Sequence, residues 1–135
     1  MSRSFTHQVR VYWADTDAGG VVYHSNYLDW CEQARTECLR SLGISQQELA
    51  AREGLVFTVV EAALRFRRPA RLDDLLTVRS SAQIAGGASV AFRQEIWREA
   101  APAELLVTAD VRVACVDAAG FRPRRIPESI RKEFS

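Results

Sequence analysis

Residues 25–42 carry apolar side chains at intervals of three and four residues, and this is the longest segment of the chain with that spacing. The spacing predicts an amphipathic helix. Its apolar positions are Tyr27, Leu28, Trp30, Cys31, Ala34, Cys38, Leu39 and Leu42. Because they spread over more than one narrow face, we expect the helix to be largely enclosed. Ser25 or Asn26 can cap its first turn, and Gly43 ends it.

Most of the remaining chain alternates between apolar and polar residues, which predicts strands. We expect the strands at residues 5–13, 55–67, 75–84, 88–98 and 104–116. Their connections are of hairpin length, which favours antiparallel pairing. A short helix is expected over residues 44–53 and a helical turn over residues 127–134. This order predicts an α+β fold in which a curved antiparallel sheet wraps around one long helix.

The alternation also predicts which side chains of each strand face the core. In the first strand, Trp13 shares a face with Phe5, His7, Val9 and Val11. In the second, the core side chains are Val60, Ala62, Leu64 and Phe66. In the last, they are Leu105, Val107, Ala109, Val111, Val113 and Cys115.

Composition excludes several classes of protein. The 135 residues fit one domain, which we place at residues 1–135. A net charge of +1 argues against a nucleic-acid-binding protein. No apolar run approaches the ~20 residues of a membrane helix, and the N-terminal residues lack the apolar region of a signal peptide. We therefore expect a cytoplasmic protein without a transmembrane segment.

The cysteines predict neither a disulfide nor a zinc site. Cys31, Cys38 and Cys115 form no C-x-x-C pair, and the chain has only two histidines. Cys31 and Cys38 lie about 10 Å apart along the predicted helix, too far for a disulfide. We expect three buried, reduced thiols that pack as small hydrophobic groups.

Polar residues and glycines concentrate between the first strand and the long helix. Asp15 and Asp17 lie close together, and Gly19 and Gly20 allow a ligand to approach the backbone. The helix begins just after His24, so its unpaired N–H groups and positive dipole end can face an oxygen atom. From these residues alone, a catalytic site and a plain turn with aspartates bonded to its own backbone are both open.

Other known kinds of site fit the residue spacing of this segment less well. A metal site at Asp15, Asp17 and His24 stays an alternative, although three ligands in one turn are not specific. An EF-hand beginning at Asp15 would place Asn26 where a carboxylate is required. The chain has neither the G-x-S-x-G of α/β-hydrolases nor a P-loop.

The string D-T-D-A-G-G-V-V-Y-H-S-N-Y at residues 15–27, continued by A-R-T-E at residues 34–37, closely resembles hotdog-fold acyl-CoA thioesterases. The subgroup that it resembles is the bacterial thioesterase encoded beside the Tol–Pal envelope system, a relative of 4-hydroxybenzoyl-CoA thioesterase. The similarity continues through residues 69–74 and 116–117 to residues 123–130, and so covers nearly the whole chain. It implies a hotdog fold, a long helix wrapped by a five-stranded antiparallel sheet.

The resemblance also implies roles for single residues. Asp17 matches the catalytic carboxylate, which acts as nucleophile or as general base for water. His24 matches the histidine that follows Val-Val-Tyr in this subgroup. Its backbone N–H at the helix start is suited to polarise the thioester carbonyl, and its ring would orient water or substrate. We expect the substrate pocket to be lined or packed by Gly20, Tyr23 and Tyr27.

Two further residues matter because they are not expected to react. Asp15 is expected to be structural, accepting hydrogen bonds from the amides of the turn. Many relatives carry tyrosine at the position of Trp13, so any hydroxyl that assists there is missing and Trp13 is not counted as catalytic. Since a thiolate leaves readily, one carboxylate and a polarised carbonyl can suffice.

The implied substrate is acyl-CoA or an acyl-carrier-protein thioester, with no metal or redox cofactor. The arginines at 65–71 and 122–125 are candidates for the CoA phosphates, or else form a solvated basic face. Relatives pair their sheets edge to edge, so we expect a homodimer or homotetramer, with peripheral envelope association left open. A hotdog dehydratase and a non-catalytic acyl-binding or scaffold protein of the envelope machinery remain alternatives.

Overall fold

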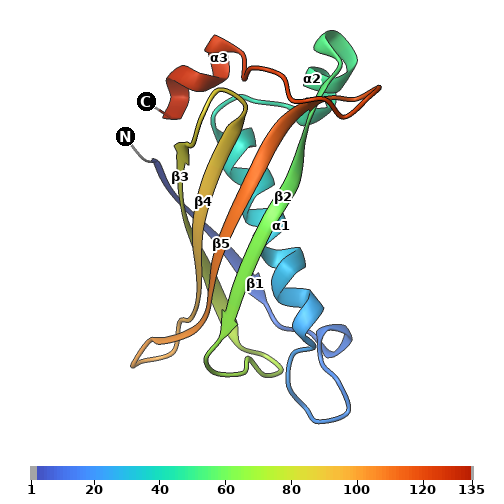
Figure 1. Ribbon diagram of the computed structural model, residues 1–135. Helices are drawn as coiled ribbons and strands as arrows, with labels where there is room; N and C mark the ends of the chain where they lie inside the picture. Colours follow the sequence, from blue (N-terminus) through green and yellow to red (C-terminus); the bar gives the residue numbers. More distant parts are fainter. Residues whose placement is uncertain (1–2, 135) are drawn as a thin grey trace.

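The computed structural model describes residues 3–134. A five-stranded antiparallel sheet curves around α1 (His24–Ser41), with the strands in the order β1-β3-β4-β5-β2 (Figure 1). The strands are β1 (Arg3–Arg10), β2 (Leu55–Phe66), β3 (Leu75–Ile84), β4 (Ser89–Arg98) and β5 (Glu104–Asp117). The predicted α+β architecture is confirmed, and β1 and β2 are the two edges of the sheet.

Two short helices lie at the end of the sheet that is far from the start of α1 (Figure 1). They are α2 (Gln46–Glu53) and α3 (Glu128–Arg131), the latter followed by a 3₁₀ turn over Lys132–Phe134. Ser45 caps α2 by accepting a hydrogen bond from the Glu48 N–H at 3.2 Å. Both predicted helical segments are confirmed. Among the described helices, none is long and apolar enough to cross a bilayer.

Only one face of α1 is covered by the sheet. Its buried side chains are Tyr27, Trp30, Cys31, Ala34, Cys38 and Leu39. The helix packs mainly against β1 and β3, and Leu28 on its other side is 47% exposed. The expectation of a largely enclosed helix is therefore wrong for the single chain. The expected N-caps Ser25 and Asn26 are wrong too, because the helix begins at His24 with Tyr23 as N-cap and without a side-chain cap. Gly43 follows the end of the helix with φ of +80°, as expected.

The first strand is shorter than predicted. β1 ends at Arg10, and Trp13–Asp15 forms a 3₁₀ turn. Asp15 closes this turn by accepting a hydrogen bond from the Tyr12 N–H at 2.9 Å. Trp13 is consequently 75% exposed instead of facing the core.

A bulge in β2 moves one predicted core side chain off the inner face of the sheet. The pairing with β5 shifts between Val59 and Glu61, so Val60 occupies the bulge and does not share the inner face as predicted. Phe57 faces the core before the bulge, and Leu64 faces it afterwards. The helix leaves this edge uncovered, and Val60 is 52% exposed.

A second bulge shifts the alternation at the start of β5. Ile96 pairs with Val107, whereas Trp97 pairs with Leu105. Leu106 is left over between them and is fully buried. The prediction that Leu105 shares the core face of β5 is therefore wrong, because one extra residue reverses the pattern.

Candidate active site

A tight turn precedes α1 and carries Asp17. Thr16 and Val22 pair across it as an isolated bridge. The Asp17 N–H donates to the Val21 carbonyl at 2.9 Å, and the Gly20 N–H donates to the Asp17 carbonyl at 3.0 Å. Gly20 has φ of +79°, a conformation that side chains disfavour. The backbone thus holds Asp17 in a fixed position just before the helix.

One oxygen of the Asp17 carboxylate is held and the other is free. Oδ1 accepts a hydrogen bond from the Gly19 N–H at 2.8 Å. Within residues 3–134, Oδ2 has no hydrogen-bond donor, and the residue is exposed. The carboxylate is therefore oriented by its own turn while one oxygen stays available for chemistry.

Asp15 connects the 3₁₀ turn to the start of α1. Besides the bond from Tyr12, its backbone carbonyl accepts from the Tyr23 N–H at 2.9 Å and from Asn26 Nδ2 at 3.0 Å. The structural role expected for Asp15 agrees with these contacts. Asn26, considered from the sequence only as a cap, instead ties the first turn of the helix back to Asp15.

His24 is the first residue of α1. In the described part of the chain, its backbone N–H has no hydrogen-bond acceptor, as expected for the first turn of a helix. Its ring lies 4.3 Å from that of Tyr23, centroid to centroid. The helix start thus presents an unpaired donor and the positive end of its dipole directly after the turn that carries Asp17.

A cavity of about 290 Å³ opens beside His24. Its walls are Val22, His24, Tyr27, Phe66, Arg67, Arg68 and Pro69. Tyr27 contributes to this cavity from a buried position, whereas Tyr23 is 49% exposed and is not among its walls. The cavity therefore combines an apolar floor with two arginines next to the helix start.

The loop that follows β2 holds the helix start from the other side. The Ala70 carbonyl accepts a hydrogen bond from the Val22 N–H at 2.9 Å, and the Ala70 N–H donates to the Tyr27 hydroxyl at 3.0 Å. Burial raises the pKa of the Tyr27 phenol above its ordinary value, so the group stays protonated at neutral pH. Ala70 thus connects this loop to the helix start of the candidate site by two hydrogen bonds.

Tyr27→Phe should destabilise the protein. It leaves the buried Ala70 N–H without an acceptor, and we expect the free energy of unfolding to fall by about 1–3 kcal/mol. Urea titrations of this variant and of Tyr23→Phe measure the effect. Tyr23 is exposed, so its variant should stay within about 0.5 kcal/mol of wild type. Equal stability of the two variants would contradict the role given to the Tyr27 hydroxyl.

A second, smaller cavity lies between α1 and the sheet. It measures about 100 Å³ and is lined by Glu32, Arg35, Thr36, Leu39, Gln46, Phe57, Val59, Val90, Phe92 and Val113. Beside it, the fully buried Gln94 donates from Nε2 to the Cys31 carbonyl and to Ser80 Oγ, both at 3.0 Å. Its Oε1 accepts from Arg35 at 3.0 Å. Gln94 is not among the site residues predicted from the sequence, although a glutamine among inward-facing apolar residues is a visible signal of a buried polar contact.

The cysteines are unsuited to nucleophilic catalysis. All three are free and buried, as expected. Burial raises the pKa of Cys31 to about 11 and that of Cys38 to about 12, and it also raises the pKa of Cys115. These thiols therefore stay protonated at neutral pH, and a thiol is a poor nucleophile.

The candidate metal ligands and the two groups of arginines do not form one common site. Over residues 3–134, no three His, Cys, Asp or Glu side chains gather closely enough to hold a metal ion. The alternative of a site at Asp15, Asp17 and His24 thus has no support in the geometry. Arg67 and Arg68 line the cavity beside His24, whereas the 122–125 group lies towards the far end of the sheet, near α2 (Figure 1).

Comparison with known proteins identifies the family. The model of the thioesterase superfamily matches residues 19–102. The chain belongs to this superfamily. It is 41% identical to the acyl-CoA thioesterase YbgC of Haemophilus influenzae, over 99% of this chain and 96% of that protein. The acyl-CoA thioester hydrolase YbgC of Escherichia coli O157:H7 is 45% identical, over 96% and 95% of the two chains.

Solved structures agree with this assignment. The probable thioesterase from Bartonella henselae superposes with a TM-score of 0.85 at 39% identity, covering 93% of this chain and all of that one. The hotdog fold and the thioesterase family implied by the resemblance are confirmed.

Proposed function

We propose that this member of the thioesterase superfamily hydrolyses acyl-CoA to a carboxylic acid and CoA, with Asp17 and the helix start at His24 as the reacting site. Two features of one short segment carry the proposal. The Asp17 carboxylate has one free oxygen, and seven residues later the N–H of His24 at the helix start has no acceptor among the described residues. The two YbgC relatives, similar over nearly the full chain, support acyl-CoA as the substrate class. Release of free thiol from acyl-CoA tests it.

The mechanism needs only groups that the chain supplies. The thioester carbonyl oxygen accepts a hydrogen bond from the His24 N–H, and the helix dipole stabilises the negative charge that develops on it. Such donors contribute about 10²–10³-fold in rate. Asp17 either attacks the carbonyl carbon or removes a proton from the attacking water. In either route the C–S bond breaks and CoA leaves as thiolate, which takes up a proton. Attack by activated water gives the acid directly, whereas attack by Asp17 gives an acyl-aspartyl anhydride, which a water molecule then hydrolyses to the acid and free Asp17.

The cavity beside His24 is the proposed binding region for the substrate. Tyr27 and Phe66 supply apolar surface, and Gly20 leaves the backbone of the turn without a side chain. Arg67 and Arg68 are the arginines placed to meet phosphate oxygens of CoA. Tyr23 is proposed to contact the substrate from outside this cavity. The same arginines would accept an acyl-carrier protein, whose prosthetic group also carries a phosphate.

The uncovered edge at β2 supports assembly into a homodimer. Val59 and Val60 on this edge strand are 46% and 52% exposed, and Phe66 at its end is 55% exposed. An apolar strand with unpaired backbone groups is suited to pairing with a second copy. Because Phe66 also lines the cavity beside His24, the dimer would place the site next to the partner. A tetramer would join two such dimers.

The proposal extends to the compartment and the cellular context of the protein. The three free thiols fit a reducing compartment such as the cytoplasm. Association with the Tol–Pal envelope system stays a prediction from the resemblance. Relatives named as hydrolases favour hydrolysis over the dehydratase and scaffold alternatives.

His24→Ala separates the backbone of this residue from its ring. The variant keeps the N–H at the helix start, so we expect a partial loss of kcat, smaller than that of Asp17→Asn. Initial rates of both variants, each checked for folding by circular dichroism, make the comparison. A loss as large as that of the Asp17 variant would mean that the imidazole itself takes part in the reaction.

A further inference from the structure

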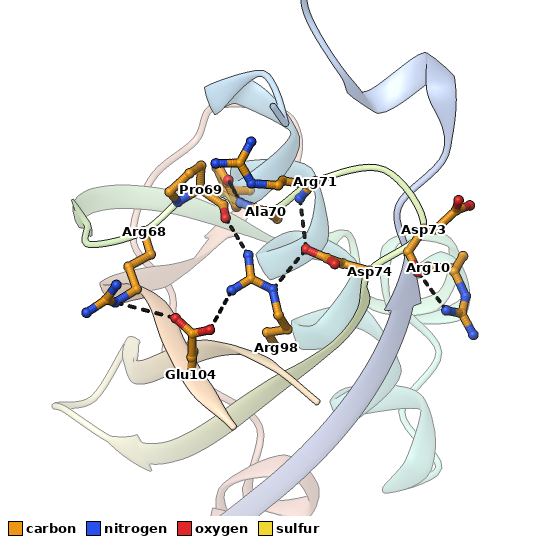
Figure 2. Close-up of polar contacts among 10 residues, drawn as sticks. Arg10, Arg68, Pro69, Ala70, Arg71, Asp73, Asp74, Arg98 and Glu104 are labelled. Atoms are coloured by element: carbon orange, nitrogen blue, oxygen red, sulfur yellow. Dashed lines mark hydrogen bonds and ion pairs between the residues drawn. The ribbon is translucent and has the colours of Figure 1, made fainter. Parts of the chain in front are cut away.

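Arg98, the last residue of β4, binds both ends of the loop over residues 69–74 (Figure 2). Its Nη2 donates to the Pro69 carbonyl at 2.6 Å, and its Nε donates to Asp74 Oδ2 at 3.0 Å. Its Nη1 donates to Glu104 Oε1 at 3.1 Å. The Arg98 side chain is only 16% exposed. Each nitrogen of the guanidinium therefore has its own acceptor, and two of the three acceptors belong to one loop.

Further bonds make this loop compact and attach it to the first strand. Asp74 Oδ2 also accepts from the Arg71 N–H at 2.9 Å, which closes a turn within the loop. The Asp74 carbonyl accepts from the Val11 N–H at 3.0 Å, and the Asp73 carbonyl accepts from Arg10 Nη1 at 2.7 Å. The loop is thus braced by β1 on one side and by Arg98 on the other.

The same loop contacts the candidate site. Ala70, directly after Pro69, binds Val22 through its carbonyl and Tyr27 through its N–H. Val21 also pairs with Arg71 as an isolated bridge. These contacts lie on both sides of His24, so the loop determines where the helix start stands relative to the turn of Asp17.

We propose that Arg98 is a positioning residue for catalysis, which acts by fixing the 69–74 loop and, through Ala70, the turn of Asp17 and the helix start. The inference rests on the proposed function for the identity of the site. The fork of the guanidinium is needed because a carbonyl and two carboxylates must be bound in different directions at once, which a lysine ammonium does less well. Arg98 itself does not touch the substrate.

Arg98→Met tests this role because it keeps an unbranched apolar side chain and removes the three donors. Small displacements of reacting groups lower the rate strongly, and we expect kcat to fall on the order of 10-fold. The KM for acyl-CoA should change much less, since Arg67 and Arg68, the arginines proposed to bind phosphate, are retained and Arg68 keeps Glu104 as its ion-pair partner at 3.5 Å. Arg98→Lys, which keeps the charge and some hydrogen bonding, should recover part of the rate.

Arg93→Met is the matched control. Arg93 lies on the same strand and forms an ion pair with Asp110 at 2.7 Å, with the two side chains 49% and 66% exposed. This variant removes the same charge and an ion pair across the same two strands. We expect its kcat to stay within about 2-fold of wild type, as an exposed pair contributes little.

Amide hydrogen exchange at Val22 gives a readout that is independent of activity. Its N–H is bonded to Ala70, so exchange should be faster in Arg98→Met than in wild type or in Arg93→Met. A kcat loss confined to the Arg98 variants, with faster exchange at Val22, supports the proposal. Equal kcat in the Arg93 and Arg98 variants would overturn it, and so would a rise in KM alone.

The test also covers an Arg98→Met protein that does not fold and a wild-type protein without activity. If Arg98→Met does not fold, Arg98→Lys is judged by the same two readouts, and unchanged kcat and exchange in that variant would overturn the proposal. If wild type itself hydrolyses no acyl-CoA, the proposed function is contradicted, while exchange at Val22 still decides whether Arg98 holds the site.

Discussion

Asp17→Asn should lower kcat by roughly 10²–10⁴-fold, the range for loss of a positioned acid or base. Asparagine is nearly isosteric and can still accept the hydrogen bond from Gly19, so the turn is preserved. It can neither attack a carbonyl nor take a proton from water at neutral pH. Because the carboxylate acts on the reacting atoms, KM should change much less than kcat. Steady-state rates on one acyl-CoA measure both.

Asp15→Asn is the control for this result. Asp15 holds the Tyr12 N–H through its carboxylate and the helix start through its backbone carbonyl. Its variant should lose some stability through a weaker turn and keep most of its kcat per folded molecule. A near-wild-type kcat for Asp17→Asn, or an equal loss for the two variants, would contradict the assignment of Asp17.

The second large effect concerns assembly. Val60→Glu places a charge on the exposed bulge of the β2 edge. In a two-fold symmetric interface both copies contribute this charge, so two carboxylates would be buried in the interface and destabilise the dimer. We expect sedimentation to shift from a dimer or tetramer towards the 15.1 kDa chain, with a large loss of turnover if the partner completes the site.

Ala85→Glu adds the same charge in the exposed turn between β3 and β4, away from β2. It should leave both mass and rate unchanged. A Val60→Glu protein with the mass and kcat of wild type would show that β2 is not the interface. A wild-type protein that sediments at 15.1 kDa at micromolar concentration would contradict assembly altogether.

The periodicity of the sequence predicts the helix and the strands because each packs one face against a common core. It cannot predict the bulges, since the extra residues at Val60 and Leu106 depend on how neighbouring strands align. For a related reason, the periodicity does not predict that one side of α1 is exposed. Apolar side chains such as Leu28 and Val60 look alike in a sequence whether they face the core or a second chain.

The sequence likewise predicts some residues of the candidate site and not others. Asp17 and His24 could be chosen because they lie in one short segment with glycines and a helix start. Ala70 and Arg98 could not, because their contacts join residues far apart in the chain, and the Ala70 N–H and the Pro69 carbonyl that take part leave no trace in residue type. Gln94 lies between these cases, as its polarity within the apolar face of β4 was readable.

Single turnover in ¹⁸O-labelled water distinguishes the two roles open to Asp17. If the carboxylate attacks the thioester directly and water then opens the anhydride at the aspartyl carbon, the first acid formed carries an unlabelled oxygen from the protein. If it activates water, the first acid carries the label. Either outcome is compatible with Asp17 as the catalytic group, and a first acid without the label shows that the carboxylate attacked the thioester.

Release of CoA thiol from aromatic, short-chain and long-chain acyl-CoA, with Asp17→Asn as the blank, tests the central claim most directly. The protein should release thiol from at least one of these classes at a rate at least about 10²-fold above that of the folded variant. Rates equal to the variant for every class would contradict acyl-CoA hydrolysis at this site.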